Sequence, residues 1–447
     1  PPSLPAVRKI VNGFSPSGSE QPVYNGYTSP GVNTLVTTTP KFDFMIEKDV
    51  MVPMRDGIQL AADIYRPAVN GRLVEGRFPV ILERTPYGKS IDSRSDRSLR
   101  AMQKPKTRTE VAALFVERGF VVIYQDCRGR YNSQGNFQKY LDDAADGYDT
   151  CAWIIQQPWS SSQIGTKGLS YAAHTQAALA SFGAPGLAAM WLDSGGFSNA
   201  YLGGIRQGGA FELKQVTWAY RQALNSSQVR SDPQLRARLE AVDLFEWFQK
   251  MPWQPGSSPL SLVPEYEDYL FEQWQHGDFD QYWQQAGIYA QGYYDQFPDC
   301  PQMHMSSWYD AYAQTAIDNY QGLSRRKTGP IRLIMGPWTH GDRSLSYVGD
   351  VDFGPAAPLD GNLAEDYWDL RLRWFDHWML GVKNGVDQEP AVRYFRMGGG
   401  TGRKNMDGRL DHGGIWLSAK DWPLPGMQPT RFYLQRDGSL SHTAPPA

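Results

Sequence analysis

A serine between a strand-like and a helix-like segment is the first residue of this chain whose surroundings could support chemistry. Residues 164–169 are typical of a strand end and residues 171–180 of a helix without Gly or Pro, with Ser170 between them. A serine on such a tight turn can act as a nucleophile, because the first N–H groups of the helix face the oxygen that forms. Taken alone, however, a Gly-x-Ser before a helix is more often an ordinary N-cap.

A serine nucleophile needs a neighbouring base and an acid that orients the base. Of the seven histidines, only His340 lies in a loop directly after a buried, strand-like run. His174 follows Ser170 by one helical turn and His377 lies in an aromatic helix-like segment, so we expect other roles for both. In hydrolases with a serine on a strand-to-helix turn, the chain order is serine, acid, histidine. Asp310, which closes another strand-like run, fits that order.

These side chains need a scaffold that brings strand ends together. A hairpin signal, Asp56-Gly57, joins two β-favouring runs, and apolar runs of strand length then alternate with helix-like segments. This rhythm predicts an α/β fold with a parallel sheet covered on both faces, in which ligands bind beyond the carboxyl ends of the strands. One of the helices, over residues 142–157, presents an apolar face of Ala145, Tyr148, Ala152 and Ile155.

The pattern also predicts how the chain is divided. Residues 197–297 carry helix-like pieces at 211–224, 233–250, 265–275 and 279–288, which indicates a helical lid, and we expect the acidic run 265–283 to be a solvated face rather than the wall of an entrance. The expected parts are an N-terminal arm (1–40), the first part of the α/β core (41–196), the lid (197–297), the second part of the core (298–386) and the start of a C-terminal β domain (387–447).

Five short motifs, in order, resemble one enzyme family. Gly168-Leu169-Ser170-Tyr171, Ser307-Trp308-Tyr309-Asp310 and Gly336-Pro337-Trp338-Thr339-His340 are similar to the three catalytic motifs of the cocaine-esterase-like (CocE/NonD) serine hydrolases. That family also holds α-amino-acid ester hydrolases, glutaryl acylases and X-Pro dipeptidyl peptidases. Arg84-Thr85-Pro86-Tyr87 and Asp126-Cys127-Arg128-Gly129 match two further family segments, and the resemblance runs from about Met45 to the C-terminus.

The resemblance implies a role for each matching residue. Ser170 attacks the acyl carbon, His340 transfers the proton, and Asp310 holds the imidazole. The backbone N–H of Tyr171 and the hydroxyl of Tyr87 form the oxyanion hole. Two tryptophans that flank triad members are expected to line the acyl pocket, although packing alone would also explain them: Trp308 and Trp338.

The chain departs from the family pattern in three places. Ala173 stands where the family usually has a glycine, and a methyl group there should be tolerated. Ala311-Tyr312-Ala313 replaces the carboxylates with which α-amino-acid ester hydrolases hold a substrate ammonium, so selectivity for a free α-amino group is disfavoured. The family's C-terminal jelly roll needs more strands than about 60 residues supply. We therefore expect that β domain to be incomplete, in a chain that is truncated or completed by a second fragment.

The composition of the chain limits the kinds of partner and cofactor that can be expected. The 447 residues carry a net charge of −3, and no apolar run is long enough to span a membrane, so neither nucleic acid nor a membrane is expected as a partner. Cys127, Cys151 and Cys300 allow at most one disulfide and lack the spacing of a zinc site; no metal or organic cofactor is implied. The Pro-, Gly-, Ser- and Thr-rich first 40 residues favour export, with a cytoplasmic location as the alternative, and a homo-oligomer is possible.

The sequence thus predicts a serine hydrolase that cleaves carboxylic esters of small molecules through an acyl-enzyme. The first alternative is amide cleavage by the same triad, as in acylases and X-Pro peptidases. The second is a catalytically inactive ligand-binding protein on a hydrolase scaffold, which the loss of a triad residue would favour; no triad residue is lost here.

Overall fold

The structure is a computed structural model that describes residues 42–92 and 106–445. The predicted N-terminal arm, residues 1–40, lies outside the described residues, so its expected extended form stays a prediction.

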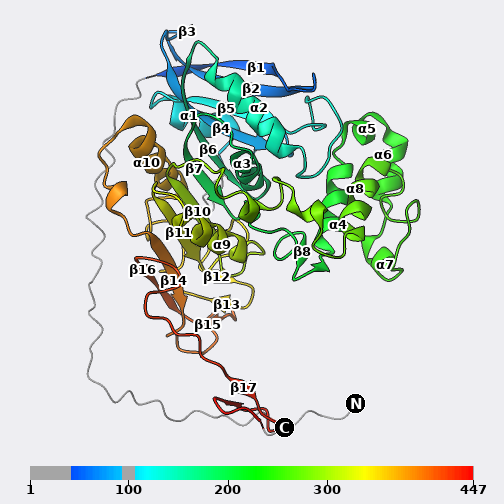
Figure 1. The fold of residues 1–447 in the computed structure, drawn as a ribbon, viewed down its shortest axis with the longest axis vertical. Coiled ribbons are helices and arrows are strands. Elements are labelled where there is room, and N and C mark those ends of the chain that lie inside the picture. The colour runs from blue at the N-terminus through cyan, green and yellow to red at the C-terminus, as the bar shows by residue number, and fades with distance from the viewer. Residues whose placement is uncertain (1–41, 93–105, 446–447) are drawn as a thin grey trace. The chain divides into compact units, whose positions relative to one another are not determined.

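An 11-stranded mixed sheet forms the centre of the described chain (Figure 1). On its main path the strands from β5 through β4 to β14 pair in parallel, and antiparallel pairs β1–β2, β2–β5 and β14–β16 stand at its two ends. In spatial order the strands are β1 (Asp43–Pro53), β2 (Gln59–Val69), β5 (Val121–Asp126), β4 (Phe78–Thr85), β6 (Ser160–Leu169), β7 (Leu187–Asp193), β10 (Gln302–Ser307), β11 (Ile331–Gly336), β14 (Val392–Met397) and β16 (Gly414–Ala419); β3 (Arg72–Leu73) pairs with β2.

Helices cover both faces of this sheet, which explains the continuous apolar strands. Val80 and Leu82 of β4 belong to one buried cluster and Ile81 to another, because successive side chains point to opposite faces. The first cluster includes residues of α2 (Asp143–Ile155), α3 (Tyr171–Ser181) and α9 (Ala313–Ser324), and the second those of α1 (Arg108–Val116) and α10 (Tyr367–Leu380). The predicted α/β fold, with helices on both faces of the sheet, is confirmed.

The predicted orientation of helix α2 is wrong. Its expected apolar face is only partly buried, and the opposite face, including Asp143 and Asp146, is buried instead. The buried guanidinium of Arg84 accounts for this, since its Nη1 donates to the Asp143 carbonyl at 2.8 Å and its Nη2 lies 3.4 Å from an Asp143 carboxylate oxygen. The contacts of Arg84 with Asp143, and not the apolar stripe, therefore decide which face of helix α2 is buried.

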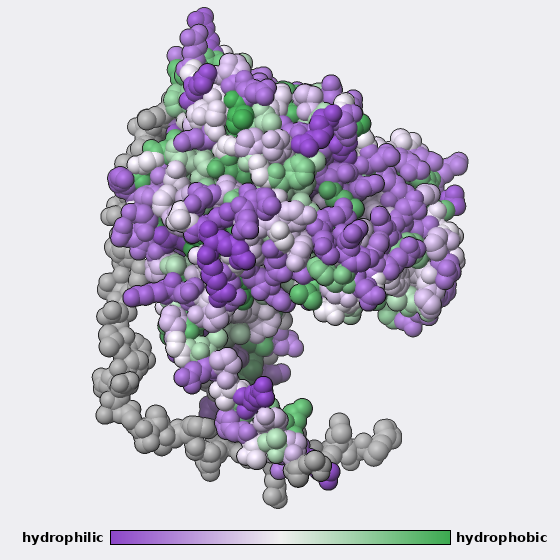
Figure 2. Space-filling model, in the orientation of Figure 1, coloured by the Kyte–Doolittle hydropathy of each residue, from purple (hydrophilic) through white to green (hydrophobic). Residues whose placement is uncertain are grey.

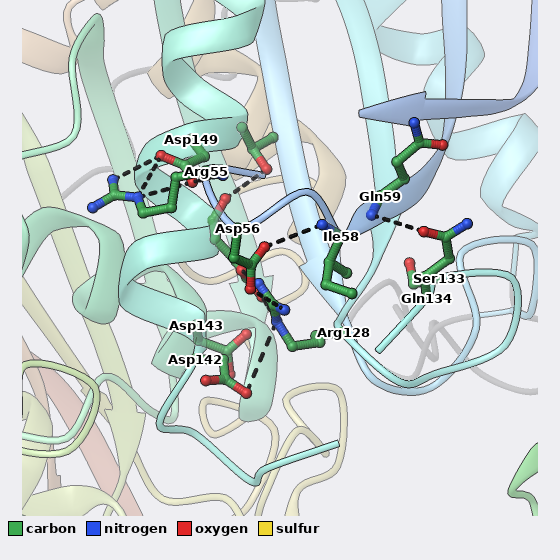
Figure 3. A network of polar contacts seen from close by, with 12 residues as sticks. Arg55, Asp56, Ile58, Gln59, Arg128, Ser133, Gln134, Asp142, Asp143 and Asp149 are labelled. Carbon is green, nitrogen blue, oxygen red and sulfur yellow. Dashed lines mark hydrogen bonds and ion pairs between the residues drawn. The ribbon is translucent and has the colours of Figure 1, made fainter. Parts of the chain in front are cut away.

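A polar network ties the β1–β2 turn to helix α2 (Figure 3). Arg128, from the Asp126-Cys127-Arg128-Gly129 motif, donates to Asp56 at 2.7 Å and to Asp146 at 2.5 Å. Next to it, Arg55 pairs with Asp149 at 2.7 Å. Arg128 of the motif that carries the resemblance thus links the β1–β2 turn to helix α2.

The predicted lid is a group of short helices beside the sheet (Figure 1). Residues 233–250 form two helices instead of one, and residues 279–288 hold only the 3-10 turn η2 (Gln281–Gln284), so the helix predicted there is wrong. The other lid elements are β8 (Arg206–Gln207), β9 (Ala210–Phe211), α4 (Lys214–Ala223), α5 (Ser227–Ser231), α6 (Pro233–Glu240), α7 (Leu244–Phe248), α8 (Pro264–Gln275) and η3 (Ala290–Gly292).

Most acidic side chains of helix α8 face solvent, as the sequence predicts, but Glu267 is buried and accepts a hydrogen bond from Ser258. Glu265, Asp268 and Glu272 are exposed, whereas Tyr266, Leu270 and other members of the helix are buried. Figure 2 shows a mostly hydrophilic surface over the lid helices.

The strands predicted to open the C-terminal domain continue the central sheet. β14 pairs with β11, and β16 with β14, so the sheet runs past residue 386. The predicted boundary at residue 387, and the completion of the β domain by further chain, stay predictions. The remaining elements are η4 (Val386–Gln388), a small sheet of β12 (Tyr347–Val348), β13 (Val351–Asp352) and β15 (Leu410–Asp411), and a hairpin of β17 (Tyr433–Leu434) and β18 (Leu440–Ser441).

Within the described ranges, no helix combines the length and apolar character needed to cross a membrane. The same residues contain no group of three or more His, Cys, Asp or Glu side chains placed to hold a metal ion. All three cysteines are buried free thiols.

Candidate active site

The predicted catalytic residues follow the carboxyl ends of parallel strands. Ser170 comes directly after β6, Asp310 three residues after β10, and His340 four residues after β11; Tyr87 follows β4 by two residues. Because these strands run in the same direction, all four residues lie at one edge of the sheet.

Ser170 is held at a positive φ, which a serine rarely adopts. Its φ is +61°, a region that costs of order 1–3 kcal/mol for a residue with a side chain. Its N–H donates to the Asp193 carbonyl at 2.8 Å, and its carbonyl accepts from the N–H groups of Ala173 and His174. The hydroxyl makes no capping hydrogen bond to helix α3. The N-cap interpretation therefore does not describe this serine, and strain at the turn is typical of a functional site.

His340 and Asp310 form a hydrogen-bonded pair. His340 Nδ1 lies 2.8 Å from Asp310 Oδ2, and the carboxylate's other oxygen accepts from the Tyr312 N–H at 2.9 Å. The Asp310 side chain is fully buried, while 41% of the His340 side chain is exposed. A proton on Nδ1, facing the carboxylate, would leave the lone pair of Nε2 able to accept a proton.

The chain neighbours of Ser170 and His340 lie close together. A Cβ placed on Gly341 would lie 3.1 Å from the Leu169 side chain, so the residue before Ser170 lies close to the residue after His340. His174 lies one helical turn after Ser170. Burial lowers the pKa of His174 well below its usual value, and the positive charges of Lys139, His340 and Lys214 lower it further.

Tyr87 is tied to the lid. Its hydroxyl accepts a hydrogen bond from the indole N–H of Trp218, on α4, at 3.0 Å, and its ring meets the rings of Tyr171 and Trp218 edge-on. An indole can only donate, so the Tyr87 oxygen is the acceptor in this hydrogen bond. No sequence motif around Trp218 indicates its contact with Tyr87.

Tyr171 begins helix α3, where backbone N–H groups have no acceptor inside the helix. Its side chain is buried, and its hydroxyl accepts from the Tyr140 N–H at 2.9 Å. Burial raises the pKa of the Tyr171 phenol. The side chain thus anchors the start of the helix, which leaves the backbone N–H for the predicted oxyanion role.

The two tryptophans predicted to line the acyl pocket make packing contacts. Trp338 is buried against Trp416 and donates to the Ala357 carbonyl at 2.8 Å. Trp308 is partly buried and donates to the Phe395 carbonyl at 2.7 Å. These contacts match the packing alternative, and a role in substrate binding stays a prediction for both.

Ala173, where the family usually has a glycine, faces a glycine of another segment. A Cβ on Gly195 would lie 2.8 Å from the Ala173 methyl group and 2.4 Å from the Ser170 carbonyl oxygen. Ala173 is fully buried in the core. The expected tolerance for its methyl group thus has a structural reason, since Gly195 leaves the space free.

The sequence of this chain matches a family model over most of its length. Residues 56–342 match the X-Pro dipeptidyl-peptidase (S15 family), and residues 384–447 match the C-terminal non-catalytic domain of X-Pro dipeptidyl-peptidases. The chain belongs to the S15 family. This confirms the resemblance to CocE/NonD serine hydrolases, and it confirms that a domain of the C-terminal type is present, while the jelly-roll arrangement stays a prediction.

Two curated relatives of this family are esterases by name. The chain is 28% identical over 410 residues to cocaine esterase from Rhodococcus sp., covering 89% of this chain and 64% of that protein. It is 26% identical over 476 residues to a putative serine esterase from Mycobacterium bovis, covering 91% of this chain and 65% of that protein. The chain therefore spans less than two thirds of the length of these relatives.

Solved structures support the fold. A CocE/NonD family hydrolase from Staphylococcus aureus matches with a TM-score of 0.60 at 20% identity, covering 90% of this chain and 60% of that one. An α-amino-acid ester hydrolase matches with a TM-score of 0.60 at 22% identity, covering 96% and 67%. The S15-family chain described here thus has the α/β-hydrolase fold.

Proposed function

We propose that this chain hydrolyses carboxylic esters through an acyl-enzyme formed on Ser170. The observation that carries the proposal is the pair of His340 and Asp310, 2.8 Å apart, at the same sheet edge as a strained serine that does not cap its helix. The membership of the S15 family and the two esterase relatives support it.

The reaction follows from the proposed roles. Ser170 Oγ forms a bond to the acyl carbon while His340 Nε2 accepts the hydroxyl proton and then gives it to the leaving alcohol. Water attacks the acyl-enzyme with its proton passing to the same nitrogen, which frees the acid and regenerates Ser170. Asp310, hydrogen-bonded at Nδ1, stabilises the imidazolium in both halves. The Tyr87 hydroxyl and the Tyr171 N–H would stabilise each tetrahedral oxyanion by about 3 kcal/mol per donor.

Amide cleavage is the second candidate, because the matching family is described as X-Pro dipeptidyl-peptidases. The same triad would serve, with stricter demand on protonation of the leaving amine. A panel of aryl and alkyl esters, aminoacyl esters and X-Pro anilides distinguishes the two candidates. Ester preference is expected, and faster turnover of X-Pro anilides than of every ester would favour the peptidase.

Labelling with a fluorophosphonate tests the nucleophile. We expect one adduct, mapped by mass spectrometry to Ser170, and a loss of ester turnover of at least about 10⁴-fold in Ser170→Ala. Ser162 is the matched control, since it lies at the other end of β6 with a similar φ of +67°, and Ser162→Ala should label and turn over normally. An adduct elsewhere, or a fully active Ser170→Ala, would contradict the proposal and favour the ligand-binding alternative.

A further inference from the structure

A buried lysine lies between the lid and the sheet edge that holds the candidate active site. Lys139 is 2% exposed and precedes helix α2. Its Nζ donates to Gln215 Oε1 at 2.7 Å and lies 3.8 Å from the ring centre of Trp218. Both partners belong to lid helix α4, and Trp218 is also the residue that donates to Tyr87. The ammonium group is therefore next to the predicted oxyanion hole.

A second lysine of helix α4 reaches the same place from the side of the predicted base. Lys214 Nζ lies 5.0 Å from the ring centre of Tyr312, and that ring is 5.6 Å from the His340 ring. Lys214 also forms an ion pair with Glu212. Lys214 therefore has a carboxylate partner in Glu212.

His174 adds an unused hydrogen-bond donor to this group. Its Nδ1 accepts from the Gly196 N–H at 2.9 Å, so the neutral ring carries its hydrogen on Nε2. Nε2 is buried and has no hydrogen-bond partner among the described residues, while the rings of Tyr140 and Tyr312 stand 5.2 Å and 5.0 Å away. A buried N–H without an acceptor is costly, which points to an acceptor that the described residues do not supply.

The charge of the group is unbalanced in the described part of the chain. Lys139 has no carboxylate partner there, and Gln215 Oε1 is its sole hydrogen-bond acceptor. Burial, together with the positive charge of Lys214, lowers the pKa of Lys139 well below its usual value. An anion bound beside these donors would oppose both effects.

We propose that the carboxylate of an anionic substrate binds among Lys139, His174 and Lys214, beside His340. The inference rests on the proposed function and specifies its substrate class. The substrate is an ester with a second, free carboxylate, either on the acyl side, as in a monoester of a dicarboxylic acid, or on the leaving group, as in an ester of a hydroxy acid. The carboxylate accepts hydrogen bonds from the two ammonium groups and from His174 Nε2, and it takes no part in bond making or breaking.

Two isosteric substrate pairs test the inference and separate the two sides. The acyl pair is mono-4-nitrophenyl glutarate against 4-nitrophenyl 5-methylhexanoate, and the leaving-group pair is 3-carboxyphenyl butyrate against 3-isopropylphenyl butyrate. In each pair an isopropyl group replaces the carboxylate. After subtraction of uncatalysed hydrolysis, we expect kcat/KM of the wild-type chain to favour the anionic member of one pair by at least about tenfold.

Lys139→Met should lower that anionic-to-neutral ratio by at least about tenfold, because it keeps the packing against Trp218 but removes the donor. Lys250→Met is the matched control: Lys250 also lies over a lid tryptophan, Trp247, but is exposed, and its loss should leave the ratio unchanged. If Lys139→Met does not fold, Lys214→Met replaces it, with the same fall in the ratio expected.

The outcomes separate this inference from the proposed function. Neutral esters cleaved as fast as anionic ones in both pairs, or a ratio that survives the lysine substitutions, would overturn the carboxylate site and leave the esterase proposal intact. Absence of turnover of every ester, together with absence of a fluorophosphonate adduct on Ser170, would overturn the proposed function itself.

Discussion

Asp310 has both carboxylate oxygens engaged, and each contact has a separate consequence. One oxygen accepts from the Tyr312 N–H and fixes the side chain, while the other faces His340 Nδ1. Since the carboxyl group is fully buried, its negative charge is little screened by water and acts mainly on the imidazole. The pair therefore sets both the orientation and the tautomer of His340.

Asp310→Asn should lower kcat for esters by about 10⁴-fold with little change in melting temperature. The amide can still accept from the Tyr312 N–H, but its NH₂ group would face His340 and favour the tautomer with the proton on Nε2, which cannot accept from Ser170. Steady-state kinetics and thermal unfolding check this result.

The lid supplies a matched control for that substitution. Asp280 pairs with His276 Nδ1 at 2.6 Å, and both side chains are partly exposed. Asp280→Asn should leave kcat unchanged. Equal losses in the two variants would mean that disturbed folding, and not the tautomer of His340, explains the effect.

Sequence reasoning could place the predicted triad but not its surroundings. Ser170, Asp310 and His340 each follow a strand of the central sheet, and a strand followed by a loop is a pattern that is local in the chain. Trp218 and Lys139 approach the site only through contacts between the lid and the sheet edge, over 131 residues of separation for Trp218 and Tyr87. No local pattern of residue types records such a contact.

At the scale of elements, the turn from β6 to α3 depends on two glycines that give it room. A Cβ on Gly168 would lie 2.4 Å from the Cβ of Ala172, and one on Gly195 would lie 2.4 Å from the Ser170 carbonyl oxygen. The second contact is with backbone, which cannot rotate away as a side chain can. The position of Ser170 is therefore sensitive to a residue 25 positions further along the chain.

Gly195→Ala should destabilise the chain by about 1–3 kcal/mol and lower kcat by a larger factor than KM changes, because it displaces the turn that carries Ser170. Denaturant unfolding and ester kinetics check both effects. Gly203→Ala is the control, since its Cβ would meet only Gln314 at 3.5 Å, an ordinary contact. A Gly195→Ala variant with unchanged kcat would contradict the close packing of this turn.

Helix α4 links the lid to the predicted oxyanion hole through one hydrogen bond. Trp218→Phe removes the donor to the Tyr87 hydroxyl but keeps an aromatic ring against Tyr171. The Tyr87 hydroxyl would then lose one of the contacts that orient it, so we expect kcat to fall by about tenfold, less than the about 10²-fold or more for loss of an oxyanion donor, with KM little changed.

Trp253→Phe is the control for this prediction, because the Trp253 indole donates to the Trp247 carbonyl within the lid at 3.0 Å. It should cost stability without changing kcat. A rise in KM alone in Trp218→Phe would instead assign Trp218 to substrate binding rather than to the orientation of Tyr87.

The elements themselves were predicted well wherever apolar periodicity determined them. The apolar runs of strand length form strands β4, β5, β7 and β11, whereas the predictions for the buried face of α2 and for a helix over residues 279–288 were wrong. Helix α2 buries Asp143 and Asp146 against Arg84, and an apolar stripe cannot report a buried ion pair. Lid segments pack on rings of other lid segments, so their local pattern is weaker.

At the scale of the whole molecule, one buried aspartate joins three parts of the sheet through its carboxylate and its backbone carbonyl. Asp126 ends β5, its Oδ1 accepts from the Lys89 N–H at 2.6 Å after β4, and its carbonyl accepts from Ser133 Oγ, which in turn accepts from Ala61 N–H in β2. Burial raises the pKa of Asp126 to about 6, the largest of several effects on that group. Ionisation of Asp126 therefore lowers the free energy of unfolding of the folded chain.

This shift predicts how the free energy of unfolding depends on pH. The folded-state pKa of about 6 exceeds the unfolded value of about 3.9, so the Asp126 contribution to stability falls as pH rises from about 4 to about 6. Relative to wild type, Asp126→Asn should gain about 2 kcal/mol more stability at pH 7.5 than at pH 4.5. Urea unfolding at the two pH values measures this difference.

Asp149→Asn is the control of opposite sign, because the pKa of Asp149 is lowered and Arg55 donates to its carboxylate. This variant should be less stable than wild type, by similar amounts at both pH values. A gain for Asp126→Asn that does not change with pH would mean that Asp126 ionises in the folded chain as readily as in the unfolded one.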